Sequence, residues 1–364
     1  MCDGGRHAAR PVTVGARGRR GKRTPVPSHA KPLRRLGFLT IGLFDPADPA
    51  QGHEQTLRLV ELGEQLGFDS AWVRHRHLQY GISSPVAVLA AATQRTSRIE
   101  LGTAVIPVGW ENPLRLAEDL ATTDLLSGGR LNPGVSVGRP GHWEQVSGAL
   151  YPDTAEAEDF GYERVRRLLG FLRGEPATDF SGVEGIEVYS DRVQPVSPGL
   201  ADRLWYGGGS LRSARWAGEQ GLSLLTSNVV RAEEAEDFAE IQRSQIAAFR
   251  AHHPLGAAAR VSQGLVVIPT DSATPEQRAR YEEYVRARTP RTATPQGPAR
   301  VMFARDLVGP SAAIAEQLSA HAGFREVDEV VFALPFTFGH EDYVQILTDI
   351  ATHLAPALGW KPTL

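Results

Sequence analysis

Two short segments hold the residues with the clearest chemical potential, and the first is His75-Arg76-His77, directly after the apolar stretch Ser70–Val73. Imidazole and guanidinium groups at this density can transfer protons or stabilise an anion. The His-x-His spacing can also hold a metal ion, but only with further ligands; the fifth and sixth strand ends hold no histidine and the last holds no carboxylate. We therefore expect acid–base or anion-stabilising chemistry and no metal, with a structural surface pair as the alternative.

The second segment is Gly207-Gly208-Gly209-Ser210, which joins a predicted strand to a predicted helix. Three glycines allow a close backbone approach and positive φ angles. The N–H groups at the helix start, together with the hydroxyls of Ser210 and Ser213, form a suitable site for an anion, and Arg212 can add charge. The pattern predicts phosphate binding. A tight turn with a serine cap is the alternative.

The elements that position these segments alternate regularly between apolar strands and amphipathic helices. The predicted strands are Leu36–Phe44, Ser70–Val73, Ile99–Ile106, Arg130–Val137, Arg203–Tyr206, Leu222–Thr226, Val261–Ile268 and Glu329–Leu334. The predicted helices in the second half of the chain are Ser210–Glu219, Arg231–His252, Thr274–Arg288, Ser311–His321 and His340–Leu354. Such alternation favours right-handed βαβ units and a parallel sheet.

Eight such units predict an α/β fold of the (β/α)8 (TIM) barrel type, with insertions after strands 4 and 7 at Arg139–Ala201 and Pro269–Pro310. The second insertion is rich in proline and arginine, so we expect a mobile flap there. An open doubly wound sheet would need G-x-G-x-x-G after its first strand, and the chain has Phe44–Pro49 instead. In a barrel both chemical segments would meet at the C-terminal ends of the strands.

Composition excludes several classes of protein. The 364 residues carry a net charge of −3, include one cysteine, and contain no apolar run long enough to span a membrane. Residues 1–35 hold ten basic residues and one acidic residue, so they carry +9 and the remainder carries −12. We expect 1–35 to be a disordered basic tail and 36–364 to be one domain.

A tethering segment for anions or nucleic acid and a targeting peptide are alternative interpretations of the tail. The balanced overall charge gives no sign of nucleic-acid binding. With neither a membrane span nor an export signal evident, we expect a cytoplasmic protein.

Several segments, in order along 36–360, resemble the bacterial luciferase-like flavin-dependent monooxygenase family. They are Leu66–Val73, Thr96–Val105, Asn112–Asp119, Leu126–Leu131, Arg215–Gly221 and Ala355–Trp360. The resemblance implies a barrel, usually a homodimer, that binds reduced FMN (FMNH2) or, in some branches, coenzyme F420. It also implies a C4a-peroxyflavin that oxygenates a small hydrophobic or aromatic substrate, with FMNH2 supplied by a separate flavin reductase.

The resemblance also assigns roles to residues of this chain. It implies a non-proline cis peptide at Ala104-Val105 under the flavin ring, and further flavin contacts from Ser136 and Val137. Phosphate would be held by Gly208, Gly209, Ser210 and Ser213. The luciferases have a phosphate-binding arginine where this chain has Val137, and Arg164 is the candidate to supply that positive charge.

The family motif after the second strand is commonly Glu-His-His, and here it is His75-Arg76-His77. We therefore expect His75 or His77 to take the acid–base part, and Arg74 or Arg76 to hold an anion. Three other functions stay open: F420-dependent hydride transfer on the same barrel, non-catalytic flavin binding, and metal-dependent hydrolysis.

Overall fold

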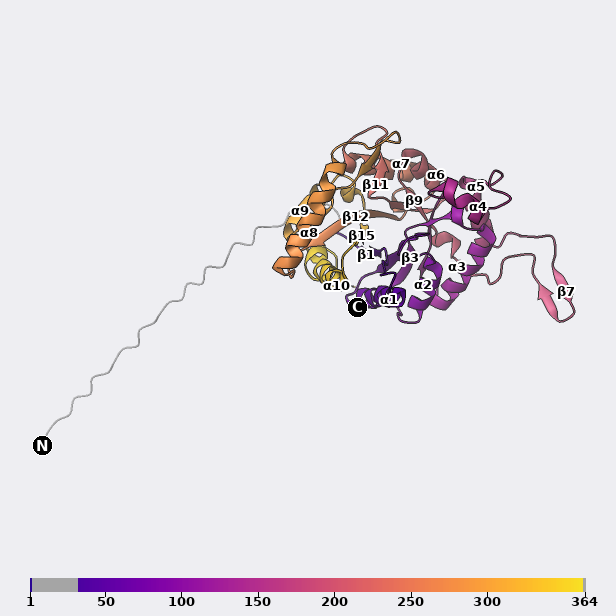
Figure 1. Cartoon of the computed structure of the whole chain (residues 1–364), viewed down its shortest axis with the longest axis horizontal. Helices are drawn as coiled ribbons and strands as arrows, with labels where there is room; N and C mark the ends of the chain where they lie inside the picture. The colour runs from indigo at the N-terminus through magenta and orange to yellow at the C-terminus, as the bar shows by residue number, and fades with distance from the viewer. Residues whose placement is uncertain (2–31, 363–364) are drawn as a thin grey trace.

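The computed structural model describes residue 1 and residues 32–362, and the latter form an α/β barrel (Figure 1). The predicted basic tail lies largely outside the described residues. Packing begins slightly before the expected boundary at residue 36, because Leu33 is only 3% exposed and its N–H donates to the carbonyl of Leu358 at 3.0 Å.

The barrel has eight strand positions, two of which are interrupted. They are β1 (Arg35–Thr40), β2 (Ser70–Val73), β3 with β4 (Glu100–Thr103, Ile106–Pro107), β5 with β6 (Leu131–Asn132, Gly134–Ser136), β9 (Trp205–Gly208), β10 (Ser223–Thr226), β12 (Val261–Pro269) and β15 (Glu329–Ala333). All pair in parallel, and β15 pairs with β1. The ring closes because β3 pairs with β5 while β4 pairs with β6. The predicted (β/α)8 barrel is confirmed.

Side chains fill the barrel below its C-terminal mouth. Trp72 and Trp205 meet edge to face with ring centroids 5.4 Å apart, and Leu225 and Val331 complete this internal cluster. At the strand starts, Arg260 lies over the Trp205 ring at 4.7 Å and pairs with Glu329 at 2.8 Å. These side chains therefore fill the N-terminal end of the barrel.

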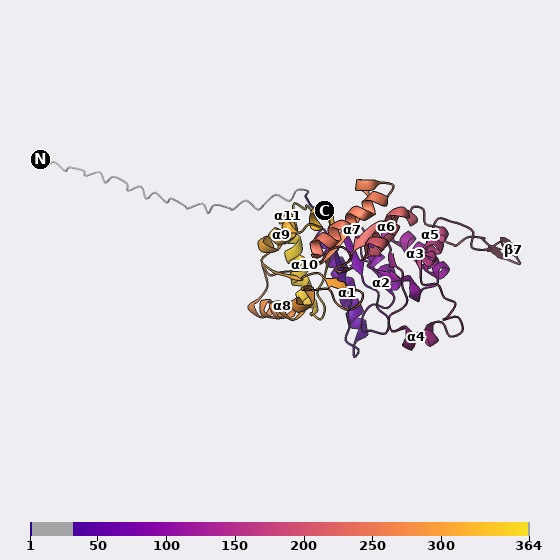
Figure 2. The same ribbon diagram turned by 90° about the horizontal axis from the view of Figure 1, so that it is seen from above.

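Helices cover the outside of the barrel (Figure 2). They are α1 (Pro49–Gln65), α2 (Pro85–Thr93), α3 (Pro113–Ser127), α5 (Tyr162–Leu172), α6 (Leu211–Glu219), α7 (Phe238–His252), α9 (Ser311–Ala320) and α10 (His340–Asp349). Their ends follow local chemistry: the Asn112 side chain accepts from the N–H of Leu114 at 2.9 Å, and Gly128 ends α3 at φ 71°. Within the described residues, no helix has the length and apolar character to cross a membrane.

The helix predicted over Arg231–His252 begins only at Phe238. The preceding residues form β11 (Val229–Arg231), which pairs antiparallel with β13 (Val301–Phe303), and Asp237 caps α7 by accepting from the N–H of Glu240. This pairing between two strands far apart in sequence overrides the local helical pattern.

The two predicted insertions differ in character. The first holds α4 (Trp143–Leu150) and a hairpin of β7 (Gly182–Glu184) and β8 (Glu187–Tyr189), which projects away from the barrel (Figure 1). The second holds α8 (Pro275–Arg288) and β14 (Leu307–Gly309), which pairs with β12. The expected flap is wrong, because Tyr281 on α8 is fully buried and donates to Asp342 at 3.0 Å.

Candidate active site

Two cavities open at the C-terminal ends of the strands. The first, of about 400 Å³, is lined by residues that follow β1, β2, β3, β9, β10 and β15. The second, of about 480 Å³, lies over the start of α6. They share four lining residues, so they form neighbouring parts of one site; these are Ser136, Gly207, Gly209 and Val229.

Most residues predicted to contact a cofactor line these cavities. Ala104, Val105 and Gly208 line the first, Val137, Ser210 and Ser213 the second, and Ser136 and Gly209 both. The predicted cis peptide between Ala104 and Val105 is present. A Cβ at Gly207 would come within 2.8 Å of Val105 Cγ1, so only glycine lets β9 pack this closely on the cis peptide.

Arg164 lies elsewhere, contrary to expectation, and lines neither cavity. It is buried on α5, where its guanidinium pairs with Glu158 and donates to the hydroxyl of Tyr151 at 2.9 Å. It also donates to the carbonyl of Glu111 at 2.8 Å. Arg164 therefore braces the loop that carries Glu111. A helical pattern locates Arg164 on a helix but not on the face that meets the site.

The start of α6 combines the expected anion-binding features with one competitor. Ser210 and Ser213 form a reciprocal capping box, and Arg212 and Arg231 line the second cavity, whose lining contains no carboxylate. However, the N–H of Leu211 donates to Glu233 Oε2 at 2.5 Å. Glu233 thus occupies one of the helix-start N–H groups that a phosphate would need.

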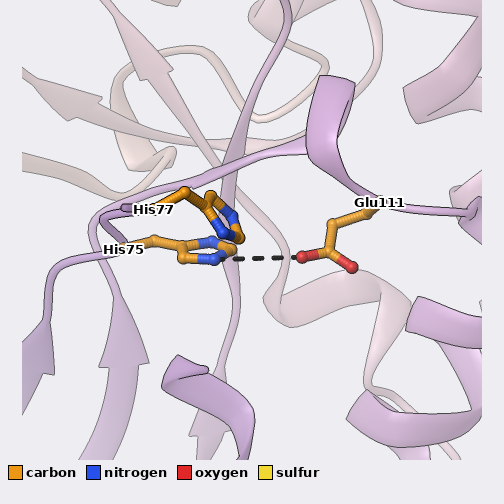
Figure 3. A group of neighbouring side chains, drawn as sticks. All are labelled: His75, His77 and Glu111. Atoms are coloured by element: carbon orange, nitrogen blue, oxygen red, sulfur yellow. Dashed lines mark ion pairs between the residues drawn. The ribbon is translucent and has the colours of Figure 1, made fainter. Parts of the chain in front are cut away.

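The two predicted histidines meet the carboxylate of Glu111, which was not among the predicted site residues (Figure 3). His75 Nε2 lies 3.9 Å from Glu111 Oε1, and the His75 and His77 ring centroids are 4.3 Å apart. His77 stacks on Trp110 at 4.0 Å with an interplanar angle of 17°. His75 is 5% exposed, and neither of its ring nitrogens has a hydrogen-bond partner among the described residues.

Glu111 comes from the loop between β4 and α3, directly before the helix cap Asn112. The position of Glu111 directly before a helix cap, on the βα loop next to the one after β2, was the sequence signal that could have identified it. In a barrel, that loop must lie beside the loop after β2.

Burial sets the charge states of this cluster. Burial, with a smaller effect from His77, lowers the pKa of His75 to about 4, and burial also lowers the pKa of His77. Burial, together with Asp119, raises the pKa of Glu111 to about 7. At neutral pH both imidazoles are therefore neutral proton acceptors, while Glu111 can gain or lose a proton.

The same three side chains could also hold a metal ion, since one ligand atom from each lies within 4.8 Å of the others. Electrostatics oppose a cation, because Arg74 and Arg76 line the adjoining cavity and that lining contains no acidic residue. We therefore treat the cluster as a group for proton transfer.

Aromatic residues near the strand ends are divided between several places. Phe336 lines the first cavity and Tyr206 the second. Trp143 packs against Phe160 at 4.8 Å, and Phe338 against Tyr281 at 4.9 Å, so both support loops instead.

Fold and site together define a closed (β/α)8 barrel with a compound cavity at its mouth. The chain belongs to the luciferase-like monooxygenase family, whose family model matches residues 35–326. It is 32% identical over 149 residues to 4-hydroxyprotoasukamycin monooxygenase of Streptomyces nodosus subsp. asukaensis, covering 40% of this chain and 39% of the relative. It is 30% identical over 171 residues to F420-dependent glucose-6-phosphate dehydrogenase of Amycolatopsis mediterranei (strain U-32), covering 43% and 48%.

The chain thus spans less than half the length of both curated relatives. These relatives are named as a monooxygenase and an F420-dependent dehydrogenase. Among solved structures, it resembles the oxygenating constituent of 3,6-diketocamphane monooxygenase from Pseudomonas putida in complex with FMN, with a TM-score of 0.63. That similarity covers 90% of this chain and 99% of the other at 14% identity, and it shows the fold alone.

Proposed function

We propose that the protein is a flavin-dependent monooxygenase that uses reduced FMN and O2 to oxygenate a small organic substrate with hydrophobic or aromatic character. The observation that carries the proposal is the compound cavity. Its first part has mostly apolar walls and contains the cis peptide at Ala104-Val105. Its second part has serine hydroxyls and two arginines at a helix start. A flat ring with a phosphate tail fits this division.

When bound, reduced flavin would supply the electrons and activate O2. The protein's part is binding and positioning. The start of α6, with Ser210, Ser213 and the nearby Arg212 and Arg231, would hold the phosphate. The backbone at Ala104-Val105 and the residue Ser136 would support the ring.

The histidine cluster would handle the proton of the reaction. His75 Nε2 and Glu111 Oε1 are 3.9 Å apart, so a movement of about 1 Å brings them to hydrogen-bonding distance. A proton can then pass from Glu111 to His75, or in reverse. His77, stacked on Trp110, would keep the His75 ring in place and serve as a second acceptor.

F420-dependent hydride transfer is the second candidate function, favoured by the similarity to F420-dependent glucose-6-phosphate dehydrogenase. Anaerobic titration of the full chain with FMNH2 and with reduced F420, in separate experiments, tests the choice. We expect saturable binding of FMNH2 and markedly weaker binding of F420. Tighter binding of F420 would overturn the FMN assignment.

Rapid mixing of the FMNH2 complex with O2 then tests the oxygenase part of the proposal. Flavin reoxidation by an oxygenase should pass through a spectrally distinct phase. A single phase identical to that of free FMNH2 would indicate a flavin-storing protein instead.

We also propose two partners, a separate flavin reductase that supplies FMNH2 and a second copy of the chain. The solved relative that carries FMN is described as an oxygenating constituent, which supports a separate reductase. The projecting hairpin supports a homodimer, because Val183, Ile186 and Val188 are 67%, 98% and 80% exposed. Apolar side chains at such exposure mark a surface that another chain covers.

A further inference from the structure

The loop after β2 carries two arginines, Arg74 and Arg76, whose charges no carboxylate among the described residues balances. Arg74 and Arg76 are both half-buried, and both line the first cavity. Within residues 32–362, no carboxylate lies in ion-pairing distance of either guanidinium, and neither guanidinium hydrogen-bonds to the protein. The lining of the cavity contains no aspartate or glutamate.

Several other partly buried arginines have a carboxylate partner: Arg164 pairs with Glu158, Arg203 with Asp124, Arg260 with Glu329, and Arg288 with Asp306. Arg98 and Arg130 instead donate to backbone carbonyls, and Arg291 lies over the Phe303 ring. Burying a guanidinium without a partner is costly, so an unpaired couple at one place needs an explanation. Burial and the neighbouring charge of Arg76 lower the pKa of Arg74 to about 10, and it remains a cation at neutral pH.

An anion supplied by a ligand would complete this site. The phosphate of FMN is not available, because its proposed position lies over α6, beyond β9, and neither arginine lines that second cavity. In the barrel, β9 is the third strand position along from β2, after β3 with β4 and β5 with β6. The partner of Arg74 and Arg76 must therefore be another negative group in the first cavity.

The surroundings of the arginines are apolar and aromatic. The Arg74 guanidinium lies over the Phe336 ring at 5.5 Å, and Leu39, Ile41 and Leu334 line the same cavity. A ligand that suits this mixture has a carboxylate, or a group of similar charge and size, attached to an apolar or aromatic body.

We propose that the substrate of this protein is an organic anion of this kind, and that Arg74 and Arg76 bind its carboxylate at the end of β2. That this anion is the substrate rests on the proposed function. That Arg74 and Arg76 bind an anion does not depend on the proposed function. The arginines select the substrate and orient its apolar body towards the cis peptide at Ala104-Val105. His75, between them in sequence, lies beside the bound anion.

The test uses the full chain without flavin, and measures by calorimetry the binding of benzoate, phenylacetate and decanoate against their neutral amides. We expect the acids to bind and the amides to bind at least about tenfold more weakly. Arg74→Gln and Arg76→Gln should each weaken acid binding on the order of 10- to 100-fold, because each removes charge-assisted hydrogen bonds. Arg74→Lys and Arg76→Lys should retain part of the affinity.

The matched control is Arg305→Gln, which removes an exposed arginine outside both cavities and should change nothing. Circular dichroism and thermal unfolding identify variants that fail to fold. If one glutamine variant does not fold, acid binding by the other still tests the proposal. Absence of acid binding, equal binding of acids and amides, or unchanged acid binding in both glutamine variants would overturn the proposal.

A separate titration with FMNH2 identifies the other possible anion, the reduced flavin itself. If the glutamine variants weaken FMNH2 binding but leave acid binding intact, the arginines serve the flavin and the proposal is wrong. Acid binding in a protein that binds no flavin would instead leave the anion site standing and overturn the proposed function.

Discussion

Glu233 Oε2 accepts the N–H of Leu211 at 2.5 Å, at the start of the helix where the sequence predicts a phosphate. The protein's own carboxylate thus stands where a ligand's negative charge is expected. Both groups seek the same N–H donors and the same end of the helix dipole. Binding of a phosphate would require Glu233 to move away.

This competition predicts that Glu233→Gln tightens FMN binding. Removing the negative charge near the helix start should lower the dissociation constant by roughly two- to fivefold, since such interactions are worth about 0.3–1 kcal/mol. Quenching of flavin fluorescence measures the affinity. Glu234→Gln, an exposed neighbour, is the matched control. Equal or weaker FMN binding by Glu233→Gln would place the phosphate elsewhere.

The phosphate assignment can be tested further with Ser213→Ala. The hydroxyl of Ser213 accepts from the N–H of Ser210 at 3.1 Å, so its loss should cost about 0.5–2 kcal/mol of stability through the weakened cap. It should also weaken FMN binding by about 1–3 kcal/mol. Riboflavin, which has no phosphate, provides the control ligand. Parallel losses for FMN and riboflavin would show a general distortion and not a lost phosphate contact.

Arg164→Gln separates bracing from cofactor binding. Removing the guanidinium leaves Glu158 and the carbonyl of Glu111 without their partner, so unfolding free energy should fall by about 2–4 kcal/mol. FMN affinity should change less than twofold at a temperature where the variant is folded. Arg166→Gln, on the same helix with an exposed partner, should cost less than about 1 kcal/mol. A large loss of FMN affinity without loss of stability would restore Arg164 as a flavin contact.

The raised pKa of Glu111 makes stability depend on pH. Its pKa rises from 4.5 in the unfolded chain to about 7, so the folded state binds this proton more tightly. The resulting stabilisation is fully present below pH 4.5 and is lost as pH rises through about 7. His75 acts oppositely: its pKa falls to about 4, so its contribution is present above 6.5 and is lost as pH falls towards 4.

Glu111→Gln should therefore reduce the decline of unfolding free energy between pH 5.5 and pH 8.5 by up to about 2 kcal/mol. Urea denaturation at the two pH values measures the difference. The exposed Glu219→Gln is the control and should leave the pH dependence unchanged. An identical pH dependence in Glu111→Gln and the parent chain would show that Glu111 titrates as it does in water.

A substitution in the β7–β8 hairpin tests the proposed homodimer. Ile186→Asp puts a charge on the most exposed apolar side chain of the β7–β8 hairpin. Burying that charge in a dimer interface would oppose association. We expect sedimentation equilibrium to show a dimer for the parent chain and a monomer for the variant. Leu255→Asp changes another exposed apolar residue, 65% exposed and outside the hairpin, and should leave the dimer intact. A monomeric parent chain would remove the dimer proposal.

Local sequence patterns determine the barrel and much of its mouth. Apolar runs separated by amphipathic helices lead to a parallel sheet, and a parallel (β/α)8 ring gathers its strand ends at one face. For this reason the sequence alone could place His75, Ala104, Ser136 and Ser210 at the same end of the molecule. Their order along the chain and the period of the apolar residues contain that information.

Only the tertiary structure decided which side chains share a contact. Glu111 meets His75. Glu233 caps the helix at Leu211, which is 22 residues away in sequence, and Arg164 reaches the carbonyl of Glu111, which is 53 residues away. Periodicity specifies that a residue faces inward or outward, but not which loop lies beside it or whether a charge is already paired. Those relations depend on strand register, loop paths and burial, which arise when the whole chain packs.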